Sequence, residues 1–338
     1  MRKRDMNHIN MSEVKSSGLD LPLSGNQRWQ TIGNPILRGD RDTAFRDPTV
    51  LYHDGMFYLY YSLVRREEKD RFYWYLGLST SRDFITWSAP ETLTPKSFDL
   101  NYSSPGNVFR YRDRWHISIQ TLPTPEKFRE KPAEVFPSAD DPFHVTGDHN
   151  SRIWLLSSDD LRVWSQPRLL NVFGPEVDRE SMGRIIDPYI IQDKNDPDWW
   201  WCLYKPKQEG MGISRSRDLE QWEPMQKIEC GENVCVLVKD DEYVLYHSPV
   251  DGIGEMRSTD LLHWRHAGLH VLGQTDWPWA RKRLTAGYVC DFRHVDFMGA
   301  YVMLFHGSSH QWDKNRNPHG HCSIGVAWSD DLDRWNWV

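Results

Sequence analysis

The sequence predicts an all-β fold, a five-bladed β-propeller built from four-stranded antiparallel blades. Three observations lead to this prediction. A frame of Ser-x-Asp-(Leu/Phe)-x-x-Trp occurs five times, beginning at Ser81, Ser158, Ser216, Ser258 and Ser329. A segment rich in β-forming residues precedes every copy, and no amphipathic helix longer than two turns is evident. The copies are unequally spaced, which is typical of blades with variable loops rather than of a tight solenoid.

Each unit opens on two strand segments joined by a turn. In the first unit these segments flank His53-Asp54-Gly55, a composition typical of a hairpin turn. The corresponding pairs of segments in the five units are residues 47–62, 107–121, 187–205, 232–248 and 291–308.

The third and fourth strands of each unit flank the repeated frame. In the first unit the third strand is predicted at residues 74–81, and the fourth begins at Trp87. The Ser and Asp side chains can cap the turn between these strands by accepting hydrogen bonds from its backbone N–H groups. The apolar residue and the Trp can pack between blades. We therefore interpret the frame as architecture rather than chemistry.

Two parts are predicted along the chain: an N-terminal arm of residues 1–43 and a propeller of residues 44–338. The last frame ends at Trp335, so the outer strand of the fifth blade is either very short or completed by N-terminal residues. The arm is also a candidate contact for a homodimer. Two inserts, residues 124–150 and 275–287, are Pro-rich or charged and are expected to be loops at the rim of the central site.

The composition argues against several classes of partner. The net charge is −7 and no basic block occurs, whereas nucleic acid requires clustered Lys and Arg. No stretch is long and apolar enough to span a membrane, and the charged N-terminus lacks the apolar run of a signal peptide. We expect a cytoplasmic protein as the chain stands, or a periplasmic or secreted one if a leader was removed. The five Cys form no C-x-x-C pair and are expected to be buried free thiols.

The innermost strand of each propeller blade begins near the central axis, so residues at those starts converge. The second unit offers residues 104–107 at this position. The other four units offer carboxylates, at Asp47, Asp187, Glu232 and Asp291. Like charges repel in a confined site, and such a cost is usually tolerated for function.

Residues 45–62 and 185–205 resemble the first and second acidic motifs of the family 43 glycoside hydrolases and related five-bladed glycosidases. Residues 231–248 look like an altered form of the third motif. The resemblance implies that Asp47 is the general base, that Asp187 orients the acid and tunes its pKa, and that Glu232 is the general acid. It also implies inversion of the anomeric centre, with the base and acid carboxyls about 6.5–9.5 Å apart to admit a water.

The third motif departs from the family pattern. Asn233-Val234 stands where Gly-Pro is expected, and strict alignment of the turns places Asn233 rather than Glu232 at the site. Glu229 is a further candidate acid, because the Glu229-Cys230 pair is similar to that of the fructan-processing family 32 enzymes. Family 117, which cleaves neoagaro-oligosaccharides with a His as acid, is a second resemblance. It implies that His247 is the acid and pairs with Glu255.

The leading hypothesis is an inverting, exo-acting glycosidase on oligosaccharides from plant or algal polysaccharides, such as arabinofuranosides or xylosides. The 17 Trp support it, since sugars stack on aromatic rings. The alternatives are a hydrolase of the family 117 type and a non-catalytic carbohydrate-binding propeller. No cofactor is required and no metal motif is found, although a structural cation in the central channel could use His294, His306 or His310. Expected substrate-binding residues are Arg46, Asn107, Trp115, His247 and Asp291.

Overall fold

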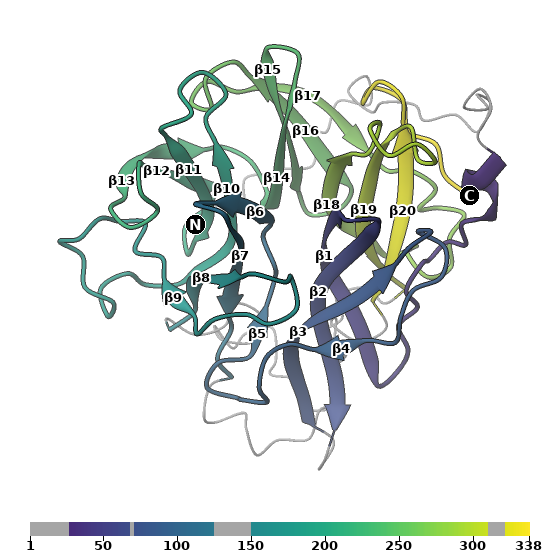
Figure 1. The fold of residues 1–338 in the computed structure, drawn as a ribbon, viewed down its shortest axis with the longest axis horizontal. Helices are drawn as coiled ribbons and strands as arrows, with labels where there is room; N and C mark the ends of the chain where they lie inside the picture. The colour runs from purple at the N-terminus through teal and green to yellow at the C-terminus, as the bar shows by residue number, and fades with distance from the viewer. Residues whose placement is uncertain (1–26, 68–70, 125–149, 310–321) are drawn as a thin grey trace, which may run out of the picture.

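The computed structural model describes residues 27–67, 71–124, 150–309 and 322–338, which form five antiparallel sheets arranged as the blades of a propeller (Figure 1). The prediction of an all-β five-bladed propeller is confirmed. The described residues contain no α-helix and only one 3-10 turn, η2 (Gln27–Thr31).

Three blades have four strands in simple sequential order. Blade one consists of β1 (Thr43–His53), β2 (Met56–Glu67), β3 (Arg71–Ser81) and β4 (Glu91–Thr92). Blade three consists of β10 (Ile185–Gln192), β11 (Trp200–Pro206), β12 (Met211–Ser216) and β13 (Glu223–Ile228). Blade four consists of β14 (Glu232–Lys239), β15 (Glu242–Ser248), β16 (Ile253–Ser258) and β17 (Arg265–His270).

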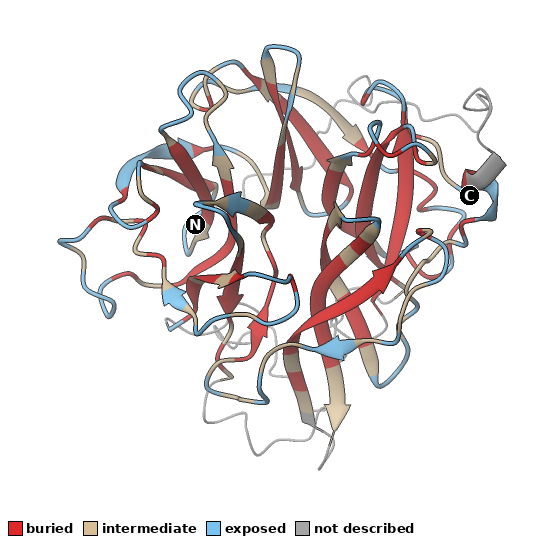
Figure 2. Ribbon diagram, viewed as in Figure 1, coloured by how far each residue is buried: buried red, intermediate tan, exposed pale blue. Residues whose placement is uncertain are grey.

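Blade two divides its innermost position between two short strands that both pair with the next strand. Its members are β5 (Tyr102–Ser103), β6 (Val108–Tyr111), β7 (Arg114–Thr121), β8 (Arg152–Ser158) and β9 (Arg168–Leu169). Figure 2 shows that burial is concentrated in the inner strands of the blades, while outer strands such as β4 and β13 are exposed. Of the five free thiols, three are buried and two are half-buried: Cys202, Cys235 and Cys322, then Cys230 and Cys290.

Blade five differs from the sequence prediction. Its strands are β18 (Arg283–Asp291), β19 (Tyr301–Ser308) and β20 (Ser323–Ser329). The innermost strand thus begins at Arg283, inside the insert that was expected to be a loop. It ends at Asp291, the residue at which the sequence predicted that it would begin. The sequence is misleading here because Phe292, Val295 and Met298 look like strand residues. They are instead buried side chains of the turn between β18 and β19.

Both predicted alternatives apply to the outer edge of blade five: Asn336 forms a β-bridge with Trp328, and N-terminal residues pair with the rest of β20. Leu37 forms a β-bridge with Ile324, and the amide of Asn34 exchanges two hydrogen bonds with the backbone of Val326 at 3.1 and 3.2 Å. Trp29 stacks on Trp328 with ring centroids 4.9 Å apart. Figure 1 shows this N-terminal segment beside β20. The described part of the predicted arm therefore belongs to the propeller, and residues 1–26 lie outside the described part of the chain.

The repeated frame forms the same turn in all five blades. In blade one, Ser81 Oγ accepts hydrogen bonds from the N–H groups of Asp83 and Phe84, and Asp83 Oδ1 accepts from those of Ile85 and Thr86. The fourth residue is buried and has a positive φ of 61–68° in every copy, at Phe84, Leu161, Leu219, Leu261 and Leu332. The Ser and Asp hydrogen bonds hold the turn in this costly conformation. The frame is architectural, as predicted.

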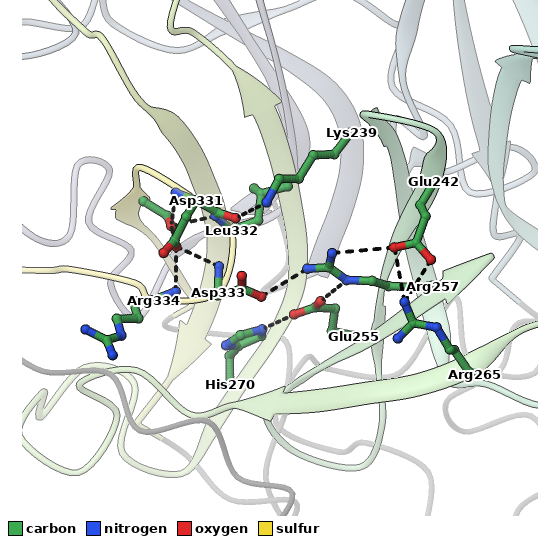
Figure 3. Close-up of polar contacts among 11 residues, drawn as sticks. Lys239, Glu242, Glu255, Arg257, Arg265, His270, Asp331, Leu332, Asp333 and Arg334 are labelled. Atoms are coloured by element: carbon green, nitrogen blue, oxygen red, sulfur yellow. Dashed lines mark hydrogen bonds and ion pairs between the residues drawn. The ribbon is translucent and has the colours of Figure 1, made fainter. Parts of the chain in front are cut away.

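A buried polar network joins blade four to the last repeated turn (Figure 3). Glu255, which is fully buried, lies 2.9 Å from both Arg257 Nε and His270 Nε2. Arg257 Nη2 also donates a hydrogen bond to Asp333 Oδ1 at 3.1 Å, which links blade four to the last repeated turn. The predicted pairing of His247 with Glu255 is therefore wrong, because Glu255 points toward β17 and blade five.

Candidate active site

The five innermost strands share an irregularity at one position. In blades one, three, four and five the register shifts by a bulge, and in blade two the strand breaks between β5 and β6. The residue at this position has a positive φ in every blade: Asp47 (50°), Ser104 (39°), Asp187 (51°), Asn233 (51°) and Ala286 (54°). Bulges of this kind redirect a side chain out of the sheet plane. We call these five the bulge residues.

The bulge residues surround one small cavity of about 30 Å³. The residue after each of them also lines it, together with Gly106, Cys235 and Tyr288. A polar cavity of this size has room for a water molecule. The cavity therefore brings a carboxyl from blade one and another from blade three to a place where a water can be held.

Asp47 is held rigidly in the cavity. Its Oδ2 accepts hydrogen bonds from Ser62 Oγ at 2.8 Å and Ser104 Oγ at 3.1 Å, and its backbone N–H donates to His306 Nδ1 at 3.1 Å. Burial alone would raise the pKa of Asp47, but the charge of Arg46 and the hydrogen bonds from Ser62 and Ser104 outweigh it and lower the pKa. The carboxylate is therefore ionised and positioned to accept a proton.

Asp187 has the opposite environment. Its backbone N–H donates to Gln120 Oε1 at 2.7 Å, and its Oδ1 accepts from Asn233 Nδ2 at 3.2 Å. Burial and the charges of Glu232 and Asp47 raise the pKa of Asp187 to about 8. Asp187 is therefore mostly protonated at neutral pH. Two carboxyl groups whose pKa values are pushed apart are the usual signature of an acid–base pair.

Glu232 lies beside the cavity rather than in its wall. It precedes the bulge residue of blade four, its side chain is 36% exposed, and its Oε1 is 3.8 Å from Arg283 Nη2. Its charge nevertheless raises the pKa of Asp187. The position that Asp187 occupies in blade three is taken in blade four by Asn233, which is what strict alignment of the turns predicted.

His247 does not lie in the cavity wall. It is buried on β15, where its Nδ1 accepts a hydrogen bond from the N–H of Gly231 at 3.0 Å. Burial, with a smaller effect of His266, lowers the pKa of His247 to about 4. The ring is neutral at pH 7 and holds the entry of β14. A buried, neutral ring outside the cavity wall gives no support to His247 as the general acid. Glu229 is exposed between β13 and β14 and does not line the cavity either.

Three predicted substrate-binding residues lie elsewhere. Asn107 links blades two and three, because its amide bonds both the C=O and the N–H of Ile190, at 2.6 and 2.9 Å. Trp115 packs against His53, six residues beyond Asp47 on β1.

Asp291 ends β18 with its side chain 41% exposed and bonded to Arg293. The error at Asp291 follows from the misplaced start of the inner strand of blade five, where the site position belongs to Ala286.

Several residues at the site were not predicted from the sequence. Ser62 and Gln120 belong to second strands, and only the folded blade brings them to Asp47 and Asp187. Arg184 precedes β10, and Arg283 lies in the insert predicted as a loop. His306 was considered only as a cation ligand, and the structure places it against Asp47. Of these two arginines only Arg184 stands beside an Asp-Pro bulge that the sequence reveals, because blade five has Ala286-Gly287 at that position.

Among the described residues, no group of three His, Cys, Asp or Glu side chains could hold a metal ion. His294 is exposed at the turn of blade five, and His310 falls outside the described residues. No helix in the described part of the chain is long and apolar enough to cross a membrane.

The fold and the cavity place the chain structurally among the five-bladed propellers represented by glycoside hydrolases. An exo-1,5-α-L-arabinanase from a bovine ruminal metagenomic library matches 88% of this chain and 97% of its own, with a TM-score of 0.57 and 15% identity. The catalytic domain of the Coprinopsis cinerea family 62 α-L-arabinofuranosidase matches 87% and 95%, with a TM-score of 0.59 and 14% identity.

A native Bacillus subtilis arabinanase matches 88% of this chain and 99% of its own, with a TM-score of 0.56 and 14% identity. At these identities the likeness establishes the fold. No protein-family model and no curated protein sequence matches the chain.

Proposed function

We propose that the protein is an inverting glycoside hydrolase. The observation that carries the proposal is the pair of buried carboxyls on one cavity, with Asp47 ionised and Asp187 protonated at neutral pH. Hydrolysis with inversion needs both states at once, a carboxylate to activate water and a carboxylic acid to protonate the leaving oxygen. The propeller fold shared with glycosidases supports the same chemistry.

In the proposed mechanism Asp47 is the general base. Ser62 and Ser104 occupy its Oδ2, so Oδ1 is the atom that takes the proton from the attacking water. The neutral His306 imidazole beside Oδ1, at 3.5 Å, cannot neutralise the carboxylate, because burial lowers the pKa of His306 well below its usual range. Asp187, which carries the proton at neutral pH, is the acid that the protonation states favour. Glu232, beside the cavity, is the acid that the family resemblance implies, with Asp187 tuning its pKa.

The substrates named for the structural neighbours make α-L-arabinofuranosides and arabinan the first compounds to test, and we propose exo action on oligosaccharides. The experiment is a panel of nitrophenyl glycosides and 1,5-arabinan oligosaccharides, with the first-formed anomer identified by proton NMR. The proposal expects turnover with an inverted anomer, and it expects Asp47→Asn to lower kcat by about 10²–10⁴ without loss of folding. Retention of configuration, or unchanged turnover in Asp47→Asn, would contradict it.

A second candidate is a sugar-binding propeller without turnover. It is favoured by one observation: Asn233, which cannot donate an acidic proton, occupies the blade-four position that matches Asp187. This candidate expects binding of oligosaccharides by calorimetry, no product from any member of the panel, and no effect of Asp47→Asn beyond a change in affinity.

A further inference from the structure

Three arginines lie beside the cavity on the side of Glu232. Arg46 is on β1, Arg184 directly precedes β10, and Arg283 is the first residue of β18. The last two are equivalent, because each stands three residues before the bulge residue of its blade. The charge of Glu232 acts on all three guanidinium groups. The fold therefore gathers positive charge from blades one, three and five around one carboxyl.

The three guanidinium groups are compensated to different degrees. Burial lowers the pKa of Arg46, but Asp47 and other acidic neighbours outweigh it and raise the pKa overall. For Arg184 and Arg283 burial prevails and the pKa is lowered. The carboxyls of the site therefore offset the effect of burial on the pKa of Arg46 but not on that of Arg283.

Arg283 is the cation with the poorest partners. Its side chain is 21% exposed, and its Nη2 is 3.8 Å from Glu232 Oε1, which is too far for a hydrogen bond. Its Nε is buried and has no hydrogen-bond partner in the described structure. Buried donors are nearly always satisfied. An acceptor supplied by a ligand at the exposed part of the guanidinium would pair with its charge.

We propose that the site takes an anionic sugar, a glycosyl residue that carries a carboxylate or a sulfate, and that Arg283 binds this group. The inference rests on the proposed function and names its substrate class. Carboxylate and sulfate oxygens match the paired N–H groups of a guanidinium. A neutral pentoside would leave Arg283 with only its long 3.8 Å ion pair to Glu232, as in the free protein.

The test is calorimetric titration of the full chain with sodium D-glucuronate, sodium D-galacturonate and D-galactose 6-sulfate, against neutral D-glucose and D-galactose. A charge-assisted hydrogen bond predicts that at least one charged sugar binds roughly ten- to a hundredfold more tightly than its neutral counterpart. The charged sugars that bind also show whether the group is a carboxylate or a sulfate. Equal affinity for charged and neutral sugars would overturn the proposal.

Variants assign the preference to Arg283. Arg283→Met is expected to reduce the ratio of affinities for charged and neutral sugars to near one. Arg283→Lys should leave an intermediate ratio, because it keeps the positive charge but loses the paired N–H donors of the guanidinium. The control is Arg162→Met, which removes an exposed positive charge at the repeated turn of blade two, and it should leave the ratio unchanged. A preference that persists in both Arg283 variants would overturn the assignment. Thermal unfolding checks that each variant folds, and Arg283→Gln replaces Arg283→Met if the latter does not.

The outcomes separate this inference from the hydrolase proposal. If the protein cleaves neutral glycosides and shows no preference for charged sugars, the hydrolase proposal stands and the proposal of an anionic substrate is overturned. If the protein prefers charged sugars through Arg283 but cleaves no glucuronide, galacturonide or neutral glycoside, the anion site stands and the hydrolase proposal is overturned.

Discussion

At the scale of single residues, the position of Asp187 decides how the site responds to pH. Asp47 and Asp187 stand at equivalent bulges with nearly the same φ, so the backbone treats them alike. Their neighbours differ: two Ser hydroxyls and Arg46 around Asp47, and burial with Glu232 around Asp187. Identical residue types therefore acquire opposite protonation states from their surroundings alone.

The first prediction concerns the alkaline limb of activity. A raised pKa of about 8 means that Asp187 holds its proton below that pH and loses it above. If this proton supports catalysis, kcat/KM should fall as pH rises through about 8. The acid limb should lie below the usual range for Asp, because the pKa of Asp47 is lowered. Asp187→Asn should abolish or shift the alkaline limb in a pH profile of kcat/KM, and an unmoved limb would exclude Asp187 as its source.

The second prediction separates the candidate acids. Loss of a general acid harms a sugar leaving group greatly and a dinitrophenolate leaving group little, since only the former needs a proton. Glu232→Gln should therefore lose about 10²–10⁴ in kcat on the oligosaccharide and much less on the dinitrophenyl glycoside. Equal loss on both substrates would make Glu232 a binding residue. The same pattern in Asp187→Asn instead would assign the acid to Asp187, and His247→Ala serves as the control outside the cavity.

At the scale of elements, the repeated turn is the unit that was predicted best. Ser and Asp are recognisable because their roles are local: each bonds N–H groups within three residues. The inner strands were harder. Their Asp-Pro bulges are visible in blades one and three, but blade five has Ala286-Gly287 at that position and carries no side-chain signal. Alternation of apolar residues could not distinguish the buried turn after β18 from a strand, so Asp291 and Arg283 were misplaced together.

The third prediction measures what one turn contributes. Ser258 Oγ accepts from the N–H groups of Asp260 and Leu261 at 3.2 and 3.0 Å, and Leu261 has a φ of 65°. Ser258→Ala should destabilise the protein by about 1 kcal/mol, by analogy with the loss of an N-cap. Thr259→Ala, at the exposed next residue of the same turn, is the matched control. Urea unfolding should show a lower midpoint for the first variant only.

At the scale of the whole molecule, stability depends on how blade five is completed. The sequence indicated a missing outer strand, because the last frame ends so near Val338, but it could not choose the segment that fills the gap. The choice depends on contacts between residues about 290 positions apart, such as Asn34 with Val326. Sequence periodicity carries no information on pairings of that kind. The grouping of charges at the site could not be predicted for the same reason, since Arg46, Arg184 and Arg283 come together only when the ring of blades closes.

The fourth prediction tests that closure. Trp29 is 2% exposed and stacks on Trp328. Trp29→Ala should destabilise the fold by about 3–5 kcal/mol, the usual cost of truncating a buried Trp, while Trp29→Phe should retain part of the stack and lose less. Chemical unfolding followed by Trp fluorescence and circular dichroism measures both. A negligible effect of Trp29→Ala would mean that the N-terminal segment is not part of the closed ring.

The contacts of Asn34 also bring two distant parts of the chain together. Its side chain bonds the backbone of Val326 in β20 and, at 3.3 Å, the carbonyl oxygen of Val338. A flexible linker could therefore join Val338 to the chain ahead of Trp29, so that the Trp29–Trp328 stack is kept, at a small cost in loop entropy. The chain would then be circular, and new N- and C-termini could be introduced at an exposed turn, such as the repeated turn of blade two around Val163. The propeller is thus suited to circular permutation, with Arg283, Asp47 and Asp187 kept on uncut strands.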